Sequence, residues 1–253
     1  GWIVTNKDVN LVTEITKTFI FDKDNNDITL VFDAMDNSGN VNEIVQSETF
    51  TIDKTAPIIN VDINGGVNNT IYYNAGNRAV ITIDVIERNF DAGLIQASIE
   101  NAYNGNIPNI SFQDLSATEH RAVVTFSEGD YTFDIRGTDL GGHSAEVNLD
   151  YEKVRRFYVD ETPPVVEENF SDFVSRDTEN YLNTEKTAVI KITEHNFDPN
   201  LVGLKILKKD AGTEHNENDL TDVTYSMVSM ADWSDDNDTH TISIKFDDDA
   251  VYL

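Results

Sequence analysis

The sequence predicts an all-β protein built from tandem β-sandwich repeats of about 107 residues. Two observations carry this prediction: segments that recur at a fixed spacing, and strands whose apolar residues alternate. Residues 50–57 (FTIDKTAP) return as residues 157–164 (FYVDETPP), so that Asp53 and Asp160 occupy the same place in the two copies. A spacing of about 107 residues is the size of a small β-sandwich.

A second recurring block predicts a strand that faces a core. Residues 72–79 (YYNAGNRA) match residues 181–188 (YLNTEKTA), and residues 80–91 (VITIDVIERNFD) match residues 189–198 (VIKITEHNFD). The first copy is longer by two residues, which is one strand period and moves no side chain to the other face. Alternate residues at the start of this block are apolar and are expected to share one face: Ala79, Ile81 and Ile83 in the first copy, and Ala188, Ile190 and Ile192 in the second.

A third block predicts a hairpin that ends in a linker. Residues 28–40 (ITLVFDAMDNSGN) resemble residues 131–143 (YTFDIRGTDLGGH), with apolar residues at alternate positions and a glycine-bearing turn after each strand. A further strand then leads into the Asp-x-Thr-x-Pro segment. Long amphipathic helical patterns are absent from the sequence. Only residues 89–99 suggest a helix, and their β-branched residues and glycine argue against one.

The proline-bearing segments predict the domain boundaries. Proline cannot donate to a sheet ladder and holds the preceding residue extended, so these segments should end one sandwich and stiffen the path to the next. We therefore expect residues 1–53 to be the C-terminal part of a preceding repeat, residues 54–160 a complete sandwich, and residues 161–253 a sandwich truncated before its last hairpin. The incomplete first repeat should be poorly packed or should borrow strands from a neighbour.

The composition excludes several classes of function. Lys and Arg number 18 against 46 Asp and Glu, which gives a formal net charge of −28. Such acidity argues against nucleic acid or an anionic membrane surface as a partner, and favours cations, basic proteins or simple solubility. The chain has no cysteine, so disulfide frameworks and cysteine nucleophiles are excluded. No apolar run approaches the length of about 18 residues of a membrane span, so direct membrane insertion is not expected.

The repeated pattern resembles the bacterial Ig-like repeats of large surface and adhesin-type proteins. The resemblance rests on the Phe-x-Ile/Val-Asp-x-Thr-Ala/Pro-Pro joint, the preceding Tyr-Thr-Phe and the Asp-x-x-Gly-Asn-like turn. It implies Greek-key, immunoglobulin-like β-sandwiches in an extracellular protein at the cell surface or cell wall of a bacterium, with neighbouring repeats as partners. The start of the strand at residues 129–131 (GDY) looks like a tyrosine corner. The cysteine pair and core tryptophan of antibody domains are missing, which limits the similarity to the bacterial branch.

The resemblance also implies possible calcium sites. Some bacterial Ig-like adhesin repeats bind calcium at their joints. Here Asp53 and Asp160 lie at the joints, and Asp36 and Asp139 begin the turns after the preceding strands. Calcium requires six to eight oxygen ligands, which carboxylates and loop carbonyls supply. The competing interpretation is that each aspartate caps a turn through its own side chain and binds nothing.

Residues 87–91 (ERNFD) and 194–198 (EHNFD) form the sharpest shared motif. Its acidic residues suggest a cation or sugar site. The structural interpretation has the phenylalanine enter the core while the glutamate and asparagine cap the exit of the strand, and it is favoured because both copies keep the aromatic residue. Four aromatic residues suggest a carbohydrate-stacking face, although most aromatics in a sandwich belong to the core: Tyr72, Tyr73, Tyr103 and Trp233.

Catalysis has little support in the sequence. The five histidines show no spacing that suggests zinc: His120, His143, His195, His215 and His240. No phosphate-binding loop, nucleophile elbow or dinucleotide fingerprint occurs. The sequence therefore predicts non-catalytic spacer repeats that present an adhesive or catalytic domain. The alternatives are an adhesin module that binds a host protein or carbohydrate, and an accessory module of a glycoside hydrolase.

Overall fold

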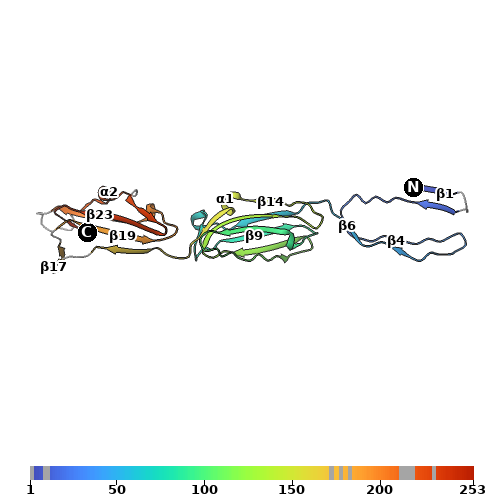
Figure 1. Cartoon of the computed structure of the whole chain (residues 1–253), viewed down its shortest axis with the longest axis horizontal. Coiled ribbons are helices and arrows are strands. Elements are labelled where there is room, and N and C mark those ends of the chain that lie inside the picture. The colour runs from blue at the N-terminus through green and yellow to red at the C-terminus, as the bar shows by residue number, and fades with distance from the viewer. Residues whose placement is uncertain are drawn as a thin grey trace. The chain divides into compact units, whose positions relative to one another are not determined.

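The computed structural model describes residues 3–7, 12–170, 174–176, 179–181, 184–210, 220–229 and 232–253 (Figure 1). The chain divides into two compact units, Gly1–Glu161 and Thr162–Leu253. Strands dominate both units, and the α-helices described are single turns, α1 (Tyr151–Val154) and α2 (Thr224–Met227). The predicted all-β class is confirmed. No described helix has the length and apolar character needed to cross a membrane.

Residues 57–161 contain two sheets. The five-stranded sheet has the order β11-β12-β9-β7-β14, in which β14 runs parallel to β7 and the other neighbours are antiparallel. The four-stranded sheet has the order β10-β13-β15-β8. The strand bounds are β7 (Ile58–Ile63), β8 (Tyr72–Tyr73), β9 (Val80–Ile86), β10 (Ile95–Asn101), β11 (Gln113–Asp114), β12 (Glu119–Thr125), β13 (Gly129–Gly137), β14 (Glu146–Leu149) and β15 (Arg156–Val159).

One apolar core joins these two sheets. Burial alternates along β9 and β12 of one sheet and along β13 and β15 of the other, as expected for strands with one face turned inward. Ala79, Ile81 and Ile83 are fully buried, which confirms the face predicted from their alternation. From the opposite sheet, the Tyr131 and Phe157 rings stack at 5.3 Å between centroids within the same core cluster.

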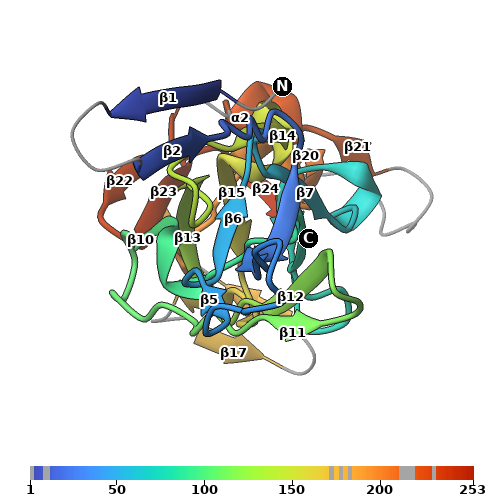
Figure 2. The ribbon, with the colours of Figure 1, turned by 90° about the vertical axis from the view of Figure 1, so that its right-hand side faces the viewer.

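The segment before Asp53 forms three separate strand pairs and has no core. The strands are β1 (Ile3–Lys7) with β2 (Val12–Thr16), β3 (Asn25–Ile28) with β6 (Phe50–Ile52), and β4 (Val31–Phe32) with β5 (Val45–Gln46). The first pair is drawn in dark blue in Figure 2. Between residues 15 and 53, all of which the structure describes, no residue is buried.

The hairpin turn of this segment repeats the turn after β13. Asp36 N donates to Asn40 O at 2.9 Å, and Asp139 N donates to His143 O at 3.2 Å. An isolated bridge joins Met35 to Val41 in one turn, and another joins Thr138 to Ser144 in the other. The third sequence block therefore folds into the same turn twice.

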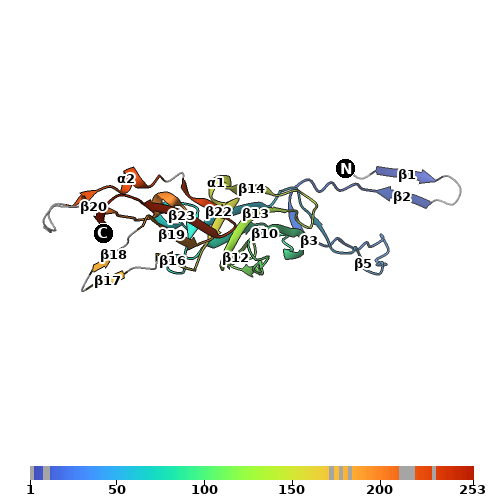
Figure 3. The ribbon, with the colours of Figure 1, turned by 60° about the vertical axis from the view of Figure 1, so that its left-hand side comes forward.

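The C-terminal unit has one well-developed sheet, with the order β16-β19-β23-β22. Its strands are β16 (Val165–Asn169), β19 (Lys186–Thr193), β22 (Ser234–Asp236) and β23 (Thr239–Phe246). A second sheet has the order β21-β20-β24, and β17 pairs with β18 as a separate hairpin (Figure 3). The bounds of these shorter strands are β17 (Val174–Arg176), β18 (Glu179–Tyr181), β20 (Leu207–Asp210), β21 (Thr221–Asp222) and β24 (Ala250–Tyr252).

Two local expectations need comment. The segment that suggested a helix forms a 3₁₀ turn, Ala92–Leu94, followed by β10, because Asp91 caps the turn by accepting a hydrogen bond from Gly93 N at 2.8 Å.

The tyrosine-corner expectation is not met in detail. Tyr131 is buried, but its hydroxyl lies 3.4 Å from Asn106 O, 25 residues upstream, whereas a tyrosine corner bonds only a few residues upstream.

Candidate functional site

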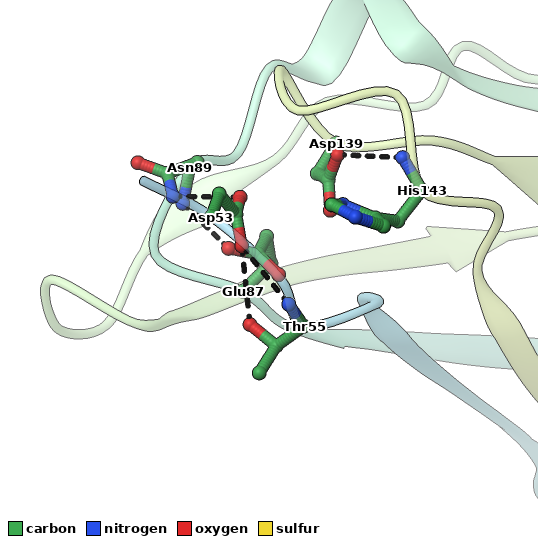
Figure 4. A network of polar contacts seen from close by, with 6 residues as sticks. All are labelled: Asp53, Thr55, Glu87, Asn89, Asp139 and His143. Carbon is green, nitrogen blue, oxygen red and sulfur yellow. Dashed lines mark hydrogen bonds and ion pairs between the residues drawn. The ribbon is translucent and has the colours of Figure 1, made fainter. Parts of the chain in front are cut away.

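Asp53, Asp139 and His143 converge at the joint between the first segment and the two-sheet body. Asp53 follows β6, Asp139 follows β13, and His143 ends the turn after β13 (Figure 4). One ligand atom from each residue lies within 4.8 Å of the other two. The Asp139 side chain is completely buried, whereas about a third of the His143 side chain is exposed. The cluster thus combines two carboxylates and an imidazole at the edge of the fold.

The turn after β13 fixes Asp139 and His143. Asp139 Oδ1 accepts a hydrogen bond from His143 N at 2.9 Å, and Asp139 Oδ2 lies 3.2 Å from His143 Nδ1. Gly142 takes a φ of +87°, a value that favours glycine. A Cβ at Gly141 would lie 3.0 Å from His143 Nδ1 and 3.2 Å from Asp53 Oδ2, so the absence of a side chain there lets the joint approach the turn.

Asn89 links the joint to the body. Glu87 lies just beyond β9 and its Oε1 accepts a hydrogen bond from Asn89 N at 2.7 Å, which turns the chain out of the sheet. The Asn89 side-chain amide then donates to Asp53 Oδ2 at 2.7 Å (Figure 4). Asn89 Oδ1 accepts from Asn26 Nδ2 at 2.7 Å, and Asn89 O accepts from Leu140 N at 3.1 Å. The Asn89 side chain therefore bonds both to Asn26, in the segment before the joint, and to the joint residue Asp53.

Asp53 is held by hydrogen bonds on both carboxylate oxygens. Oδ1 accepts from Thr55 N and from Thr55 Oγ1, each at 3.2 Å, so the Asp-x-Thr part of the linker closes on itself. Burial by itself would raise the pKa of Asp53. The hydrogen bonds from Asn89 and Thr55 outweigh that effect, with a smaller contribution from the charge of His143, and the pKa lies below its ordinary value.

The Glu-x-Asn-Phe-Asp motif has the same local structure in both units. Glu194 Oε1 accepts from Asn196 N at 2.9 Å, as Glu87 does from Asn89. Phe90 stacks on His120 and Phe197 stacks on His240, each pair at 4.0 Å between centroids. The structural interpretation of this motif, with a capping glutamate and an inward phenylalanine, agrees with these contacts.

The two stacked histidines are structural residues that the sequence did not reveal as such. His120 Nδ1 lies 2.6 Å from Asp114 Oδ1, and its Nε2 lies 2.9 Å from Glu87 O. His240 repeats both contacts, with Asp235 Oδ1 and with Glu194 O, each at 2.7 Å. Each ring therefore ties the motif to the adjacent strand. His120 lies in β12 and His240 in β23, and a histidine recurring in matching strands is the signal that could have revealed them.

The predicted calcium ligands come together only in part. Asp53 and Asp139 meet, whereas Asp36 caps its own turn by accepting from Ser38 N and Asn40 N, each at 2.8 Å. Asp160 follows β15 and its backbone N–H donates to Tyr73 O at 3.0 Å. His143 is the third member of the cluster, and the sequence suggested only that it replaces an asparagine in its turn.

The donor set does not fit calcium well. Calcium prefers six to eight oxygens, whereas the cluster offers two carboxylates and one imidazole, a ligand that suits transition metals better. All four carboxylate oxygens of Asp53 and Asp139 also have polar partners within the protein. Hydrogen bonds therefore hold each carboxylate within the protein, and calcium binding at the cluster stays a prediction.

The remaining predicted features are dispersed. Tyr73 is buried and Trp233 packs against Phe197, so only Tyr72 and Tyr103 of the four aromatics are substantially exposed. Tyr72 stacks on Tyr158 at 4.9 Å. His195 Nδ1 lies 2.8 Å from Asp238 Oδ1. His215 lies outside the described residues.

A shallow groove of about 720 Å³ runs beside β10. Its walls are polar and apolar in about equal parts, and none of the residues that line it carries an ionisable side chain: Ala92, Ile95, Gln96, Ala97, Ser98, Ile99, Ile107, Pro108, Asn109, Ile110, Ser111, Phe112 and Ile135.

Comparisons with known proteins give one distant likeness. No protein-family model and no curated protein matches the sequence. Among solved structures, the chain is similar to the mixed-linkage glucan utilization locus protein SGBP-B of Bacteroides ovatus, solved in complex with a mixed-linkage heptasaccharide. The identity is 12% and the TM-score 0.19, over 100% of this chain and 65% of that one. A likeness of this degree carries no argument about function.

Proposed function

We propose that this chain consists of immunoglobulin-like β-sandwich repeats that act as non-catalytic spacers in a bacterial cell-surface or secreted protein. Their task is to hold a distal adhesive or catalytic domain at a set distance and direction. Such a task requires joints that resist bending. The observation that carries the proposal is the 2.7 Å hydrogen bond from the Asn89 side chain to Asp53, the joint residue.

The contacts around Asp53 support a stiff joint. A flexible linker exposes its polar groups to water, whereas both Asp53 oxygens are bonded within the protein. Hydrogen bonds to a charged group contribute more than neutral ones, typically about 1.5–3 kcal/mol. Pro57 follows and restricts the backbone further. The joint is thus held by side-chain contacts and by its own limited conformational freedom.

A structural role also accounts for three of the four histidines that the structure describes. His120 and His240 brace the Glu-x-Asn-Phe-Asp motifs, and His143 closes its turn. The same motif is braced in the same way in two units, which is expected of a scaffold. A catalytic site would require a substrate cleft beside these groups, and the groove beside β10 is lined without an ionisable residue.

A ligand-binding module is the second candidate, and the groove beside β10 favours it. Its uncharged walls combine apolar side chains with amides and hydroxyls in about equal parts, including Gln96 and Asn109, and are suited to a neutral carbohydrate. Titration of the protein with neutral oligosaccharides, followed by NMR shifts of Gln96 and Asn109 side-chain amides, tests this alternative.

Trypsin cleavage at the Lys54–Thr55 bond tests the stiff joint. Cleavage there should be slow relative to cleavage at the exposed Lys17, which has no acidic neighbour in the sequence and serves as an internal reference. Asn89→Asp removes the donor to Asp53 and places two carboxylates together, so cleavage at Lys54 should accelerate at least tenfold. Asn196→Asp alters the matching motif of the other unit and should leave the Lys54 rate unchanged. Equal rates for the wild type and Asn89→Asp would overturn the proposal.

A further inference from the structure

The strand β10 forms a long open edge of its sheet. It pairs over all seven residues with β13 and has no strand on its other side among the described residues. The strands at the other edges of the two sheets are shorter, with two residues each in β8 and β11 and four in β14. The structure describes every residue from 57 to 150, so this edge is internal to the chain and does not arise at either end of it.

The backbone of β10 alternates between β13 and the open side. Just beyond the end of the strand, Ala102 N donates to Asp130 O at 2.9 Å, so the even-numbered residues of this antiparallel ladder bond to β13. The odd-numbered residues point their N–H and C=O groups the other way. At Ala97 and Ile99 these groups have no hydrogen-bond partner within the described part of the chain. Backbone donors and acceptors therefore alternate along the open edge.

The groove of about 720 Å³ lies on this open side of β10. The strand contributes residues 95–99 to one wall, and the segment 107–112 forms the other. That segment is in no strand and shares no backbone hydrogen bond with β10. Ala97, Ile110 and Phe112 are partly buried and pack against the core cluster, so the inner part of the groove is apolar. The segment therefore leaves room beside the strand edge instead of closing it.

An extended polypeptide complements this edge. Outward-facing residues of β10 recur every two residues, or about 6.8 Å, which is also the repeat of a strand laid beside it. Such a strand would bond to the N–H and C=O groups of Ala97 and Ile99, and would turn every second side chain toward the apolar residues of the groove. The hydroxyls of a carbohydrate follow no such two-residue repeat, so the edge favours a polypeptide.

The charges around the groove restrict what the added strand can carry. The chain holds 46 acidic against 18 basic residues, yet no residue that lines the groove is ionisable. A charged side chain inside the groove would lose hydration without gaining a partner. Exposed acidic residues flank the lining residues of this wall, with Asp91 before Ala92 and Glu100 after Ile99. The groove therefore suits a segment that is uncharged in its middle and basic at its ends, and it repels an acidic one.

We propose that β10 binds an extended polypeptide segment of another protein, which adds to the sheet as a further strand inside this groove. The segment carries small apolar side chains at alternate positions, no acidic residue, and basic residues at both ends. Strand addition to an open sheet edge is a general mode of peptide recognition. This docking goes beyond the spacer role and does not depend on it, and it gives the groove a polypeptide ligand in place of a carbohydrate.

Binding of a dye-labelled peptide to the full chain tests the proposal. The probe is KTVTVTVK, in which threonines and valines alternate between two lysines, and fluorescence anisotropy should show saturable binding with a Kd below about 1 mM. The control peptide ETVTVTVE should bind at least tenfold more weakly in 0.05 M sodium chloride, because the acidic protein repels it, and the difference should shrink in 0.5 M. Absence of saturable binding by KTVTVTVK, or equal binding of both peptides at low salt, would overturn the proposal.

Substitutions on both walls show whether the peptide occupies the groove. Ala97→Pro removes an outward N–H and keeps the ladder to β13, since sheets accept proline at an edge where its missing N–H faces away from the ladder. Ser111→Trp fills the groove from the opposite wall, and Ser116→Trp places the same side chain at an exposed serine outside it. The first two variants should weaken binding at least tenfold, and Ser116→Trp less than twofold. Equal binding by Ser111→Trp and Ser116→Trp would reject the site, whether or not Ala97→Pro folds.

Hydrogen exchange of the β10 amides distinguishes an added strand from another ligand. In the free protein, exchange at Ala97 and Ile99 should be faster than at Gln96 and Ser98, because only the latter two bond to β13. Saturating KTVTVTVK should slow exchange at Ala97 and Ile99 at least tenfold, whereas the neutral sugar maltohexaose should leave it unchanged. Peptide binding without this slowing would exclude strand addition. Slowing by maltohexaose alone would assign the groove to carbohydrate and would leave the spacer function untouched.

Discussion

The side-chain amide of Asn89 donates to Asp53 Oδ2 at 2.7 Å, and this bond fastens a linker residue to the loop that leaves β9. Asp53 and Asn89 are 36 residues apart in the sequence. Asn26, in the segment before the joint, donates to Asn89 Oδ1. A single asparagine therefore couples the segment before the joint to the body after it.

Stability should depend on pH through Asp53. The folded state lowers the pKa of this carboxyl, so its ionised form contributes stability that is fully present above the unfolded value of about 3.8. That contribution is lost as pH falls through the lower, folded-state pKa. The Tm of the wild type should exceed that of Asp53→Asn at pH 6, and the difference should shrink below pH 4. A difference that stays constant from pH 6 to pH 3 would contradict this assignment.

Gly141→Ala should loosen the joint. The new Cβ would lie 3.0–3.2 Å from His143 Nδ1, Asp139 Oδ1 and Asp53 Oδ2, closer than ordinary contact. We expect a loss of about 1–2 kcal/mol in the free energy of unfolding, in the range typical of local overpacking, together with faster cleavage at Lys54. Gly203→Ala is the control, since no atom lies within 4 Å of a Cβ built there. An unperturbed Gly141→Ala protein would show that the turn and the joint do not touch.

The stacked phenylalanine and histidine should stabilise both units alike. Phe197→Leu keeps apolar volume but removes the stack on His240, so the free energy of unfolding of the C-terminal unit should fall by about 0.5–1.5 kcal/mol, the usual value of an aromatic pair beyond its buried area. Trp233 lies 5.1 Å from the Phe197 ring, and its fluorescence reports this unfolding in urea. Phe90→Leu should cost a similar amount in the first unit, followed by circular dichroism. Tyr225→Leu, at an exposed aromatic, should cost nothing measurable.

Calcium should have little effect on the joint. Only two of the four predicted aspartates meet, and their oxygens already have partners. The Tm in 5 mM calcium chloride should therefore lie within about 1 °C of the Tm in excess chelator, since a ligand stabilises only by binding the folded state. A rise of several degrees that Asp139→Asn abolishes would establish the calcium site that the resemblance implies.

The strands were predictable from the sequence because their periodicity is local. Ala79, Ile81 and Ile83 alternate with the half-buried Val80 and Thr82, and all three are buried. The two copies of the Asp-x-x-Gly turn, which begin at Asp36 and Asp139, could be aligned because their pattern is also local. These features depend on neighbours within a few residues, which a single sequence displays directly.

The site was less predictable because its contacts are distant in the chain. Asn89 and Asp53 are 36 residues apart, and His120 bonds the carbonyl of a residue 33 positions away. The calcium hypothesis assumed that aspartates at matching positions of the sequence, Asp53 with Asp160 and Asp36 with Asp139, would all act as ligands. Asp36 instead accepts hydrogen bonds from the backbone of its own turn. No residue between 15 and 53 is buried, so no other described part of the chain covers that turn. The hydroxyl of Tyr131 likewise found a partner that its local sequence did not indicate.

The stiffness of the joint at Asp53 can be measured directly by single-molecule fluorescence transfer between dyes at Ser38→Cys and Ala117→Cys, in two exposed turns of a chain without other cysteines. The spacer account predicts one narrow distribution of transfer efficiency, which Asn89→Ala broadens and Asn196→Ala leaves unchanged. A wild-type distribution already as broad as that of Asn89→Ala would contradict it, because the joint would then bend freely with its hydrogen bond in place.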